Sequence, residues 1–141
     1  MFGHKKRHIV RLLLVEDEPL VAFDNEHALS DAKFEIVATV DRVATALAAI
    51  EAGGDIDLVV ADVQLADGSG IDVARAAREA GLRVLFVTGS CPEGAETLAE
   101  GWLAKPYSPK DLVAAIQVIE ARVAGKARKR LPTGFELFEA A

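Results

Sequence analysis

Five short apolar runs alternate along the chain with stretches whose apolar residues recur at helical spacing. Val43, Leu47 and Ile50 fall at positions i, i+4 and i+7, and Leu112, Ile116 and Ile119 repeat that spacing. Alternation of this kind is typical of β-α units on a parallel sheet. The expected strands are Val10–Val15, Glu35–Val40, Leu58–Ala61, Val84–Val87 and Trp102–Ala104.

Polar residues close four of these five expected strands. Glu16 and Asp17 follow the first strand, Asp62 follows the third, Thr88 follows the fourth and Lys105-Pro106 follows the fifth. The chemistry of an open α/β sheet gathers at the carboxyl ends of its strands. Right-handed crossovers and a switch in winding direction would make Asp17 and Asp62 neighbours there. Three acids, a hydroxyl and a lysine at one edge indicate a site for a divalent cation and a phosphoryl group.

Length and composition limit the broad class of protein. A chain of 141 residues with 51% hydrophobic residues fits one domain with a sizeable core. The net charge of -6 argues against a general nucleic-acid binder, which would carry a basic face. One cysteine cannot form an internal disulfide, and no apolar stretch reaches the length of a membrane span. We therefore expect a cytoplasmic protein with no nucleic-acid or membrane partner.

Four segments carry a resemblance to a known family. LLLVEDEP, LVVADVQLADGSG, VLFVTGS and WLAKPYS, in that order, resemble the receiver domain of bacterial two-component response regulators. The resemblance implies an α/β fold, a doubly wound five-stranded parallel sheet of flavodoxin-like order 2-1-3-4-5 with helices on both faces. It divides the chain into a basic N-terminal extension (1–9), a receiver domain (10–124) and a C-terminal tail (125–141) with no output domain.

The resemblance also implies a phosphorylation site with Mg²⁺ as cofactor. Asp62 would be the phosphoacceptor, since a carboxylate can attack a phosphoryl group to form an acyl phosphate. Asp17, Asp62 and the backbone carbonyl of Gln64 would bind the metal directly, and Glu16 would bind it through a water. This ligand set suits Mg²⁺, which uses one or two carboxylates and keeps several waters.

Three further residues complete the implied site. Lys105 would pair with the phosphoryl oxygens, and the family often has a cis bond between this lysine and the following proline. Thr88 would donate its hydroxyl to a phosphoryl oxygen and act as a switch. Trp102 stands where the family keeps an aromatic residue that moves with the threonine, although tyrosine or phenylalanine is more usual there.

Two regions depart from the family's pattern or leave the interpretation open. Only 17 positions separate Thr88 from Lys105, about one helical turn fewer than is typical of the family. Gly89–Gly94 is poor helix material, so we expect the fourth helix to be short, frayed or mobile. Phe135, Leu137 and Phe138 in the tail could dock on the domain or on a partner, and the sequence does not decide between docking and disorder.

The resulting hypothesis is a stand-alone receiver. A sensor histidine kinase or a histidine phosphotransfer protein would phosphorylate Asp62, and the product would bind an effector, relay the phosphate or act as a phosphate sink. The chain would not be an enzyme beyond catalysing its own phosphorylation and dephosphorylation. A haloacid-dehalogenase-like enzyme is disfavoured, because Gln64 stands where that class has its acidic proton donor. The alternative is a pseudo-receiver, an interaction module that works without phosphorylation.

Overall fold

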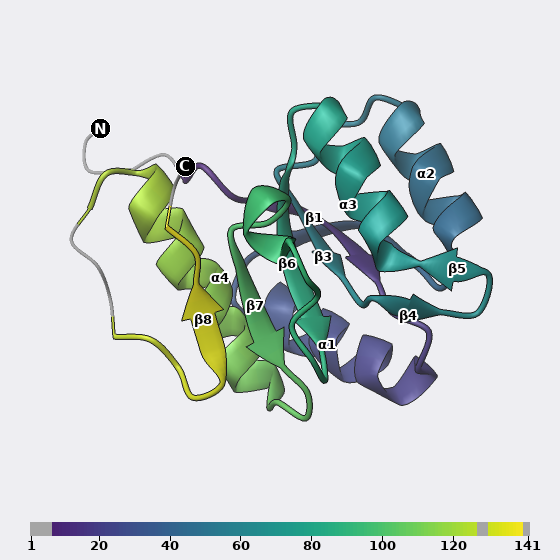
Figure 1. Ribbon diagram of the computed structural model, residues 1–141. Coiled ribbons are helices and arrows are strands. Elements are labelled where there is room, and N and C mark those ends of the chain that lie inside the picture. Colours follow the sequence, from purple (N-terminus) through teal and green to yellow (C-terminus); the bar gives the residue numbers. More distant parts are fainter. Residues whose placement is uncertain (1–6, 127–129, 140–141) are drawn as a thin grey trace.

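The computed structural model describes residues 7–126 and 130–139 as an α/β arrangement (Figure 1). Its helices are α1 (Pro19–Asp31), α2 (Val43–Glu51), α3 (Gly70–Glu79) and α4 (Pro109–Val123), with the 3₁₀ turn η1 at Ala95–Thr97. Its strands are β1 (Arg11–Val15), β2 (Glu35–Val40), β3 (Leu58–Ala61), β4 (Gln64–Leu65), β5 (Gly68–Ser69), β6 (Arg83–Thr88), β7 (Gly101–Ala104) and β8 (Phe135–Leu137).

The main sheet has the strand order β2-β1-β3-β6-β7-β8. The first five strands in this order are parallel, which confirms the predicted doubly wound sheet. Val15 pairs with Ala61, and Ala61 pairs in turn with Phe86. This register brings the carboxyl ends of β1, β3 and β6 to one edge of the sheet.

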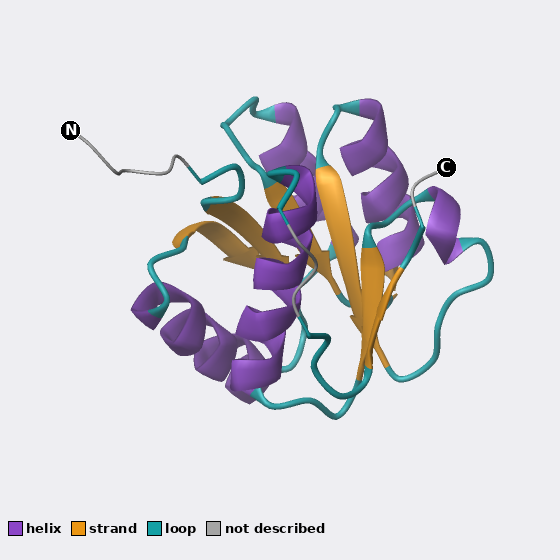
Figure 2. Cartoon of the chain, turned by 90° about the vertical axis from the view of Figure 1, so that its left-hand side faces the viewer, coloured by secondary structure: helices purple, strands orange, loops and turns teal. Residues whose placement is uncertain are grey.

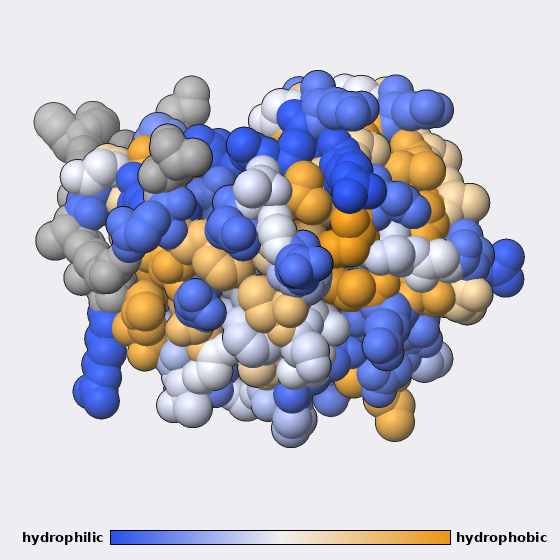
Figure 3. Space-filling view, viewed as in Figure 1, coloured by the Kyte–Doolittle hydropathy of each residue, from blue (hydrophilic) through white to orange (hydrophobic). Residues whose placement is uncertain are grey.

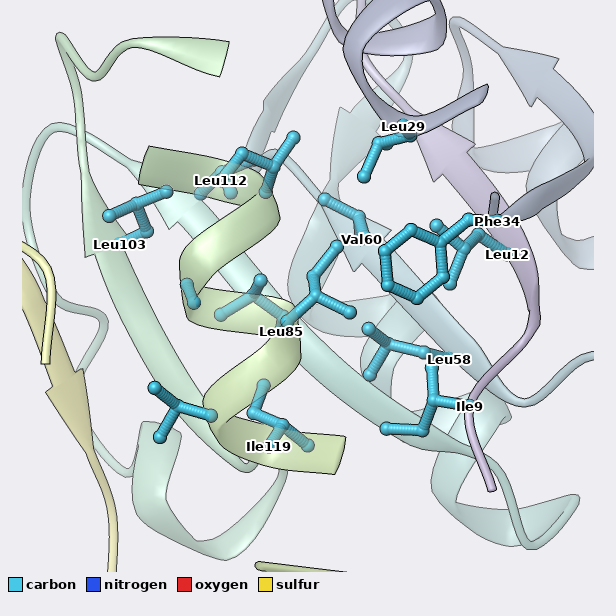
Figure 4. Packing of buried hydrophobic residues seen from close by; sticks show 14 of the residues in the cluster. Ile9, Leu12, Leu29, Phe34, Leu58, Val60, Leu85, Leu103, Leu112 and Ile119 are labelled. Atoms are coloured by element: carbon cyan, nitrogen blue, oxygen red, sulfur yellow. The ribbon is translucent and has the colours of Figure 1, made fainter. Parts of the chain in front are cut away.

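Helices cover both faces of the sheet (Figure 2). One cluster joins the strands to α1 and α4, and Figure 4 shows Leu29 and Leu112 of these helices in the same cluster as Val60 and Leu85 of the sheet. The other cluster joins the opposite face to α2 and α3 through residues such as Ile50 and Val73. Each strand of the centre is buried on both sides, which explains why β3 and β6 read as continuous apolar runs in the sequence.

Local capping fixes where the helices begin. Pro19 and Pro109 occupy the first turns of α1 and α4, where the missing amide hydrogen of proline costs no helical hydrogen bond. The Ser69 side chain accepts a hydrogen bond from the backbone amide of Ile71 and so caps α3. The cap of α2 comes from a distant residue: the carboxylate of Asp67, in the β4–β5 hairpin, accepts hydrogen bonds from two backbone amides of α2, which lower its pKa.

The segment after β6 contains no full helix. The short fourth helix expected there is the single turn η1, bordered by a groove of about 620 Å³ that Arg78, Arg122 and Phe138 help to line. Glycine and proline early in this segment explain the loss of helix. Within the described residues no helix has both the length and the apolar character needed to cross a membrane.

The C-terminal tail docks on the domain, which settles the question that the sequence left open. Its residues 135–137 form β8, an antiparallel sixth strand on the outer edge of β7. The five-stranded sheet that we predicted is therefore extended by one strand. Most of the basic extension expected over residues 1–9 lies outside the described residues.

Candidate functional site

The predicted site residues meet at one edge of the sheet. Glu16 and Asp17 follow β1, Asp62 follows β3, and one carboxylate oxygen from each of Glu16, Asp17, Glu18 and Asp62 lies within 4.8 Å of the others. Thr88 ends β6 and pairs with the last residue of β7, which places Lys105 beside it. The structure thus brings together the acids, the hydroxyl and the lysine that the strand ends predicted.

Lys105 is the cation at the centre of this cluster. Its Nζ lies 3.0 Å from Asp62 Oδ2 and 3.1 Å from Glu18 Oε2, and it also donates to Glu16 Oε2 at 3.2 Å. Burial alone would lower the pKa of the ammonium, but the hydrogen bonds to Asp62 and Glu16 outweigh it and raise the pKa. The bond between Lys105 and Pro106 is cis, as the family resemblance led us to expect.

Glu16 is an acid in an unfavourable environment. Its residue is 4% exposed, and burial raises the pKa of its carboxyl group despite the hydrogen bond from the Glu18 amide. Its Oε1 lies 3.1 Å from Lys105 Nζ but has no partner with hydrogen-bond geometry among the described residues. Four carboxylates face one ammonium here, so negative charge is in excess. A hard divalent cation with oxygen ligands would offset that charge, and the donor set fits Mg²⁺.

Asp62 is held by a tight backbone contact. The residue is 5% exposed, and its Oδ1 accepts a hydrogen bond from the Gln64 amide at 3.3 Å. After the β4–β5 hairpin the chain returns so closely that a Cβ on Gly70 would lie 1.9 Å from the Asp62 carbonyl oxygen. Gly70 therefore fixes the position of Asp62 by close approach, a role that its place in the sequence did not reveal. That the Gln64 carbonyl binds the metal stays a prediction.

The predicted switch residues are joined through one carbonyl oxygen. The carbonyl of Thr88 accepts a hydrogen bond from the indole Nε1 of Trp102 and another from the Lys105 amide, both at 3.0 Å. Thr88 is buried at 7% exposure. A displacement of the Thr88 backbone would therefore act directly on Trp102 and on Lys105.

Two features of the site were not predicted. Glu18 joins the acid cluster and pairs with Lys105, and its only signal in the sequence was its place directly after Glu16-Asp17. Behind Lys105, the amide of the buried Asn25 in α1 donates a hydrogen bond of 2.8 Å to the Tyr107 hydroxyl. This bond ties α1 to the loop that carries the lysine. Because the two residues are far apart in the chain, no local pattern could reveal it.

Tyr107→Phe should destabilise the protein by about 1–2 kcal/mol, because it leaves the buried Asn25 amide without its partner.

The stability of the protein should also depend on the ionisation of Tyr107. Burial raises the pKa of Tyr107 from 10.0 to about 12, and the hydrogen bond from Asn25 partly opposes this rise. The stability gained by keeping this phenol neutral is full below pH 10 and is lost as pH rises toward 12. Urea unfolding at pH 8 and pH 11 measures both effects. In an Asn25→Ala background the substitution should cost little, and an equal cost there would contradict this interpretation.

Comparisons with known proteins agree with this geometry. A family model described as the response regulator receiver domain matches residues 12–117. The cell cycle transcriptional regulator CtrA of Caulobacter vibrioides (strain NA1000 / CB15N) is 30% identical over 133 residues, which cover 89% of this chain and 56% of that protein. The transcriptional regulatory protein CutR of Streptomyces coelicolor is 36% identical over 122 residues, which cover 80% of this chain and 54% of that protein. The chain spans about half the length of these curated relatives.

Solved structures of the same kind share the fold. A response regulator receiver protein from Sinorhizobium medicae WSM419 is 28% identical with a TM-score of 0.67, and the match covers 77% of this chain and 92% of that one. A putative response regulator from Chloroflexus aurantiacus J-10-fl is also 28% identical, with a TM-score of 0.69 and coverage of 81% and 99%.

Proposed function

Because the chain belongs to the response regulator receiver domain family, we propose that it is a phosphorylation switch whose acceptor is Asp62. The observation that carries this proposal is the setting of Asp62. Its carboxylate lies in a cluster of four acids, and its Oδ2 is 3.0 Å from the Nζ of Lys105, the residue that follows β7. A nucleophilic carboxylate beside a fixed cation is suited to receive a phosphoryl group, because both the nucleophile and the phosphate are negative.

The reaction that we propose is transfer from a phosphohistidine. An oxygen of Asp62 attacks phosphorus, the bond between phosphorus and the imidazole nitrogen breaks, and an acyl phosphate forms. The imidazole leaves with the bonding electron pair and takes a proton from solvent. Lys105 then exchanges its contact with Asp62 for the new phosphoryl oxygens, and the Thr88 hydroxyl donates to another of them.

The acids around Asp62 would hold Mg²⁺. We assign direct contacts to Asp17, Asp62 and the Gln64 carbonyl, and a contact through water to Glu16. When bound, the ion supplies positive charge to the attacking carboxylate and the phosphoryl oxygens. The excess of carboxylates over cations supports this assignment, as does the Oε1 of Glu16, which no group of the described residues meets with hydrogen-bond geometry.

The donor would be a sensor histidine kinase or a histidine phosphotransfer protein, and α1 offers the surface for it. Leu20 and Phe23 are large apolar side chains that are 80% and 59% exposed there. The same helix borders a hollow of about 340 Å³, which lies between α1 and the Lys105 loop and is lined in part by Val21 and Tyr107. Exposed apolar side chains on α1, the helix that borders this hollow, suit a helical partner that brings its histidine to Asp62.

The phosphorylated chain would signal by contact with other proteins. It would act in the cytoplasm on an effector, pass its phosphate along a relay, or drain phosphate from the kinase. Its own catalysis would be limited to gaining and losing the phosphoryl group.

Incubation with acetyl phosphate tests the proposed function. With Mg²⁺ the intact mass should rise by about 80 Da, one phosphoryl group. A chelator should prevent the gain, and Asp17→Asn should require far more Mg²⁺. A folded chain that gains no mass under any of these conditions would contradict the proposal and favour the pseudo-receiver.

Lys105→Ala should slow phosphorylation by about tenfold or more, because it removes the charge that faces the phosphoryl oxygens. The measurement is the initial rate of mass gain from acetyl phosphate at fixed Mg²⁺. Lys110→Ala is the matched control, since Lys110 is an exposed lysine on α4. Equal rates for the Lys105 variant and the control would exclude a role for Lys105 in the reaction.

A further inference from the structure

The tail strand β8 lies on the outer edge of the sheet, next to the switch residues. Leu103 pairs with Phe135, Trp102 with Glu136 and Gly101 with Leu137. One backbone hydrogen bond flanks this pairing at each end. The Ala104 amide donates to the Gly134 carbonyl and the Phe138 amide donates to the Glu100 carbonyl, both at 2.9 Å. Figure 1 shows β8 alongside β7, and the strand order puts β8 at the opposite edge of the sheet from β2.

Side chains hold β8 in a defined register. Phe135 and Leu137 are 7% and 8% exposed and join the core on the α1–α4 side. Phe138 joins the other core, and its carbonyl accepts a hydrogen bond from Arg122 of α4. Figure 3 shows apolar side chains at the surface around this strand. An extended segment with apolar residues at alternate positions thus fits the edge of β7.

Gly101 makes this edge able to accept a strand. A Cβ at position 101 would lie 2.5 Å from the Glu136 carbonyl oxygen and 2.7 Å from a ring carbon of Phe135. The first contact is with backbone, which cannot turn aside as a flexible side chain can. A side chain at this position would therefore obstruct β8 while lying remote from the acid cluster.

The β8 pairing is short enough to open locally. Three residues of β8 pair with β7, whereas the β1–β2 and β1–β3 pairs have five and four partners. Short terminal strands open at low free energy compared with central ones. Opening would expose Phe135, Leu137 and Phe138 together with the edge of β7.

We propose that the outer edge of β7 is a strand-binding surface, occupied in cis by residues 134–138 and released to a partner's extended segment when Asp62 is phosphorylated. The release rests on the proposed function. The occupant seen here defines the partner's chemistry: an extended peptide with apolar side chains two residues apart, as in Phe135 and Leu137. Such a peptide would add to the sheet in antiparallel pairing.

The Thr88 carbonyl links phosphorylation to this edge. It accepts the Trp102 indole at 3.0 Å, and Trp102 is the residue directly opposite Glu136 in β8. When Thr88 moves toward a phosphoryl group on Asp62, its carbonyl oxygen moves away from the Trp102 indole and the hydrogen bond between them breaks. Trp102 then loses the bond that positions it, and the centre of the β7–β8 pairing loosens. Trp102 is a positioning residue in this account.

Amide hydrogen exchange on the full chain tests the release. After acetyl phosphate and Mg²⁺, exchange at residues 134–138 and at the β7 edge should become about tenfold faster, while β1 and β3 stay protected. In Trp102→Phe, which keeps an aromatic ring but lacks the indole donor, phosphorylation should leave the exchange of β8 nearly unchanged. Phosphorylated wild-type chain whose β8 exchanges at the unphosphorylated rate would overturn the release. A chain that gains no phosphoryl mass would instead contradict the proposed function.

A labelled peptide tests the strand-binding edge itself. The peptide LPTGFELFE, which copies residues 131–139, should bind the phosphorylated chain but bind the unphosphorylated chain at least about tenfold more weakly. A control peptide carries proline in place of the glutamate that corresponds to Glu136. It cannot donate the central backbone hydrogen bond to β7 and should not bind. Equal binding of the two peptides, or no binding of either, would overturn the proposal.

Gly101→Ala provides a second, independent test of whether the outer edge of β7 accepts a strand. It should speed exchange in β8 without phosphorylation and should abolish peptide binding, because its Cβ meets the added strand. Gly54→Ala is the matched control, since a Cβ there meets nothing within 4 Å. Unchanged β8 protection in folded Gly101→Ala would count against the edge as described. If this variant does not fold, the proline peptide on the wild-type chain decides the same point.

Discussion

Asp62→Asn should abolish phosphorylation while leaving the fold intact. The amide has the shape of the carboxylate, and its oxygen can still accept a hydrogen bond from Lys105 or from the Gln64 amide. It lacks the anionic oxygen that attacks phosphorus, so the expected mass gain of about 80 Da should fall below detection. Intact mass after acetyl phosphate and Mg²⁺ measures this effect.

Asp24→Asn provides the comparison for this variant. Asp24 is an exposed acid on α1, close in sequence to the site but outside the acid cluster. Its variant should take up phosphate at the wild-type rate. Thermal unfolding of both variants should stay close to wild type, which separates a lost nucleophile from a lost fold. Full phosphorylation of Asp62→Asn would show that another residue accepts the phosphate.

Gly70→Ala should destabilise the protein by about 3 kcal/mol and slow phosphorylation. The added Cβ would lie 1.9 Å from the Asp62 carbonyl oxygen and 3.0 Å from the Val63 Cα. Both neighbours are backbone atoms, so the hairpin or the segment that carries Asp62 must shift. Because this segment positions Asp62, the proposed acceptor, the loss of stability and the loss of rate should occur together. Urea unfolding and the rate of mass gain measure the two effects.

Gly54→Ala separates crowding from the general effect of replacing a glycine. A Cβ at this position meets nothing within 4 Å, and its backbone conformation is open to any residue. Its free energy of unfolding should change by less than about 1 kcal/mol. A Gly70→Ala variant as stable as Gly54→Ala would contradict the close approach on which the position of Asp62 depends.

The sheet and most of the site could be predicted because their signals are local. A buried parallel strand such as Leu58–Ala61 is a continuous apolar run, and both this strand and the half-buried Glu35–Val40 have the predicted bounds. The polar residue after each run then lies at the edge where carboxyl ends meet. Asp62 and Lys105 were found in this way, although they are distant in the chain.

The missed features depend on contacts between distant segments. Glu18 has no signal in the sequence beyond its place next to Glu16-Asp17, and only the position of Lys105 brings it into the site. Phe135 and Leu137 are apolar residues two positions apart, as in a strand. Three residues are too few to predict a strand, however, unless it is known that β7 has a free edge for them to pair with. The role of Gly101 appears only when the Glu136 carbonyl is placed beside it.

Locating the phosphoryl group by tandem mass spectrometry of a protease digest tests the central claim most directly. The chain is first phosphorylated with acetyl phosphate and Mg²⁺ and is digested quickly at low pH. We expect the added mass of about 80 Da on Asp62 and on no other residue. Its location on Glu16, Asp17, Glu18 or a histidine would contradict the account.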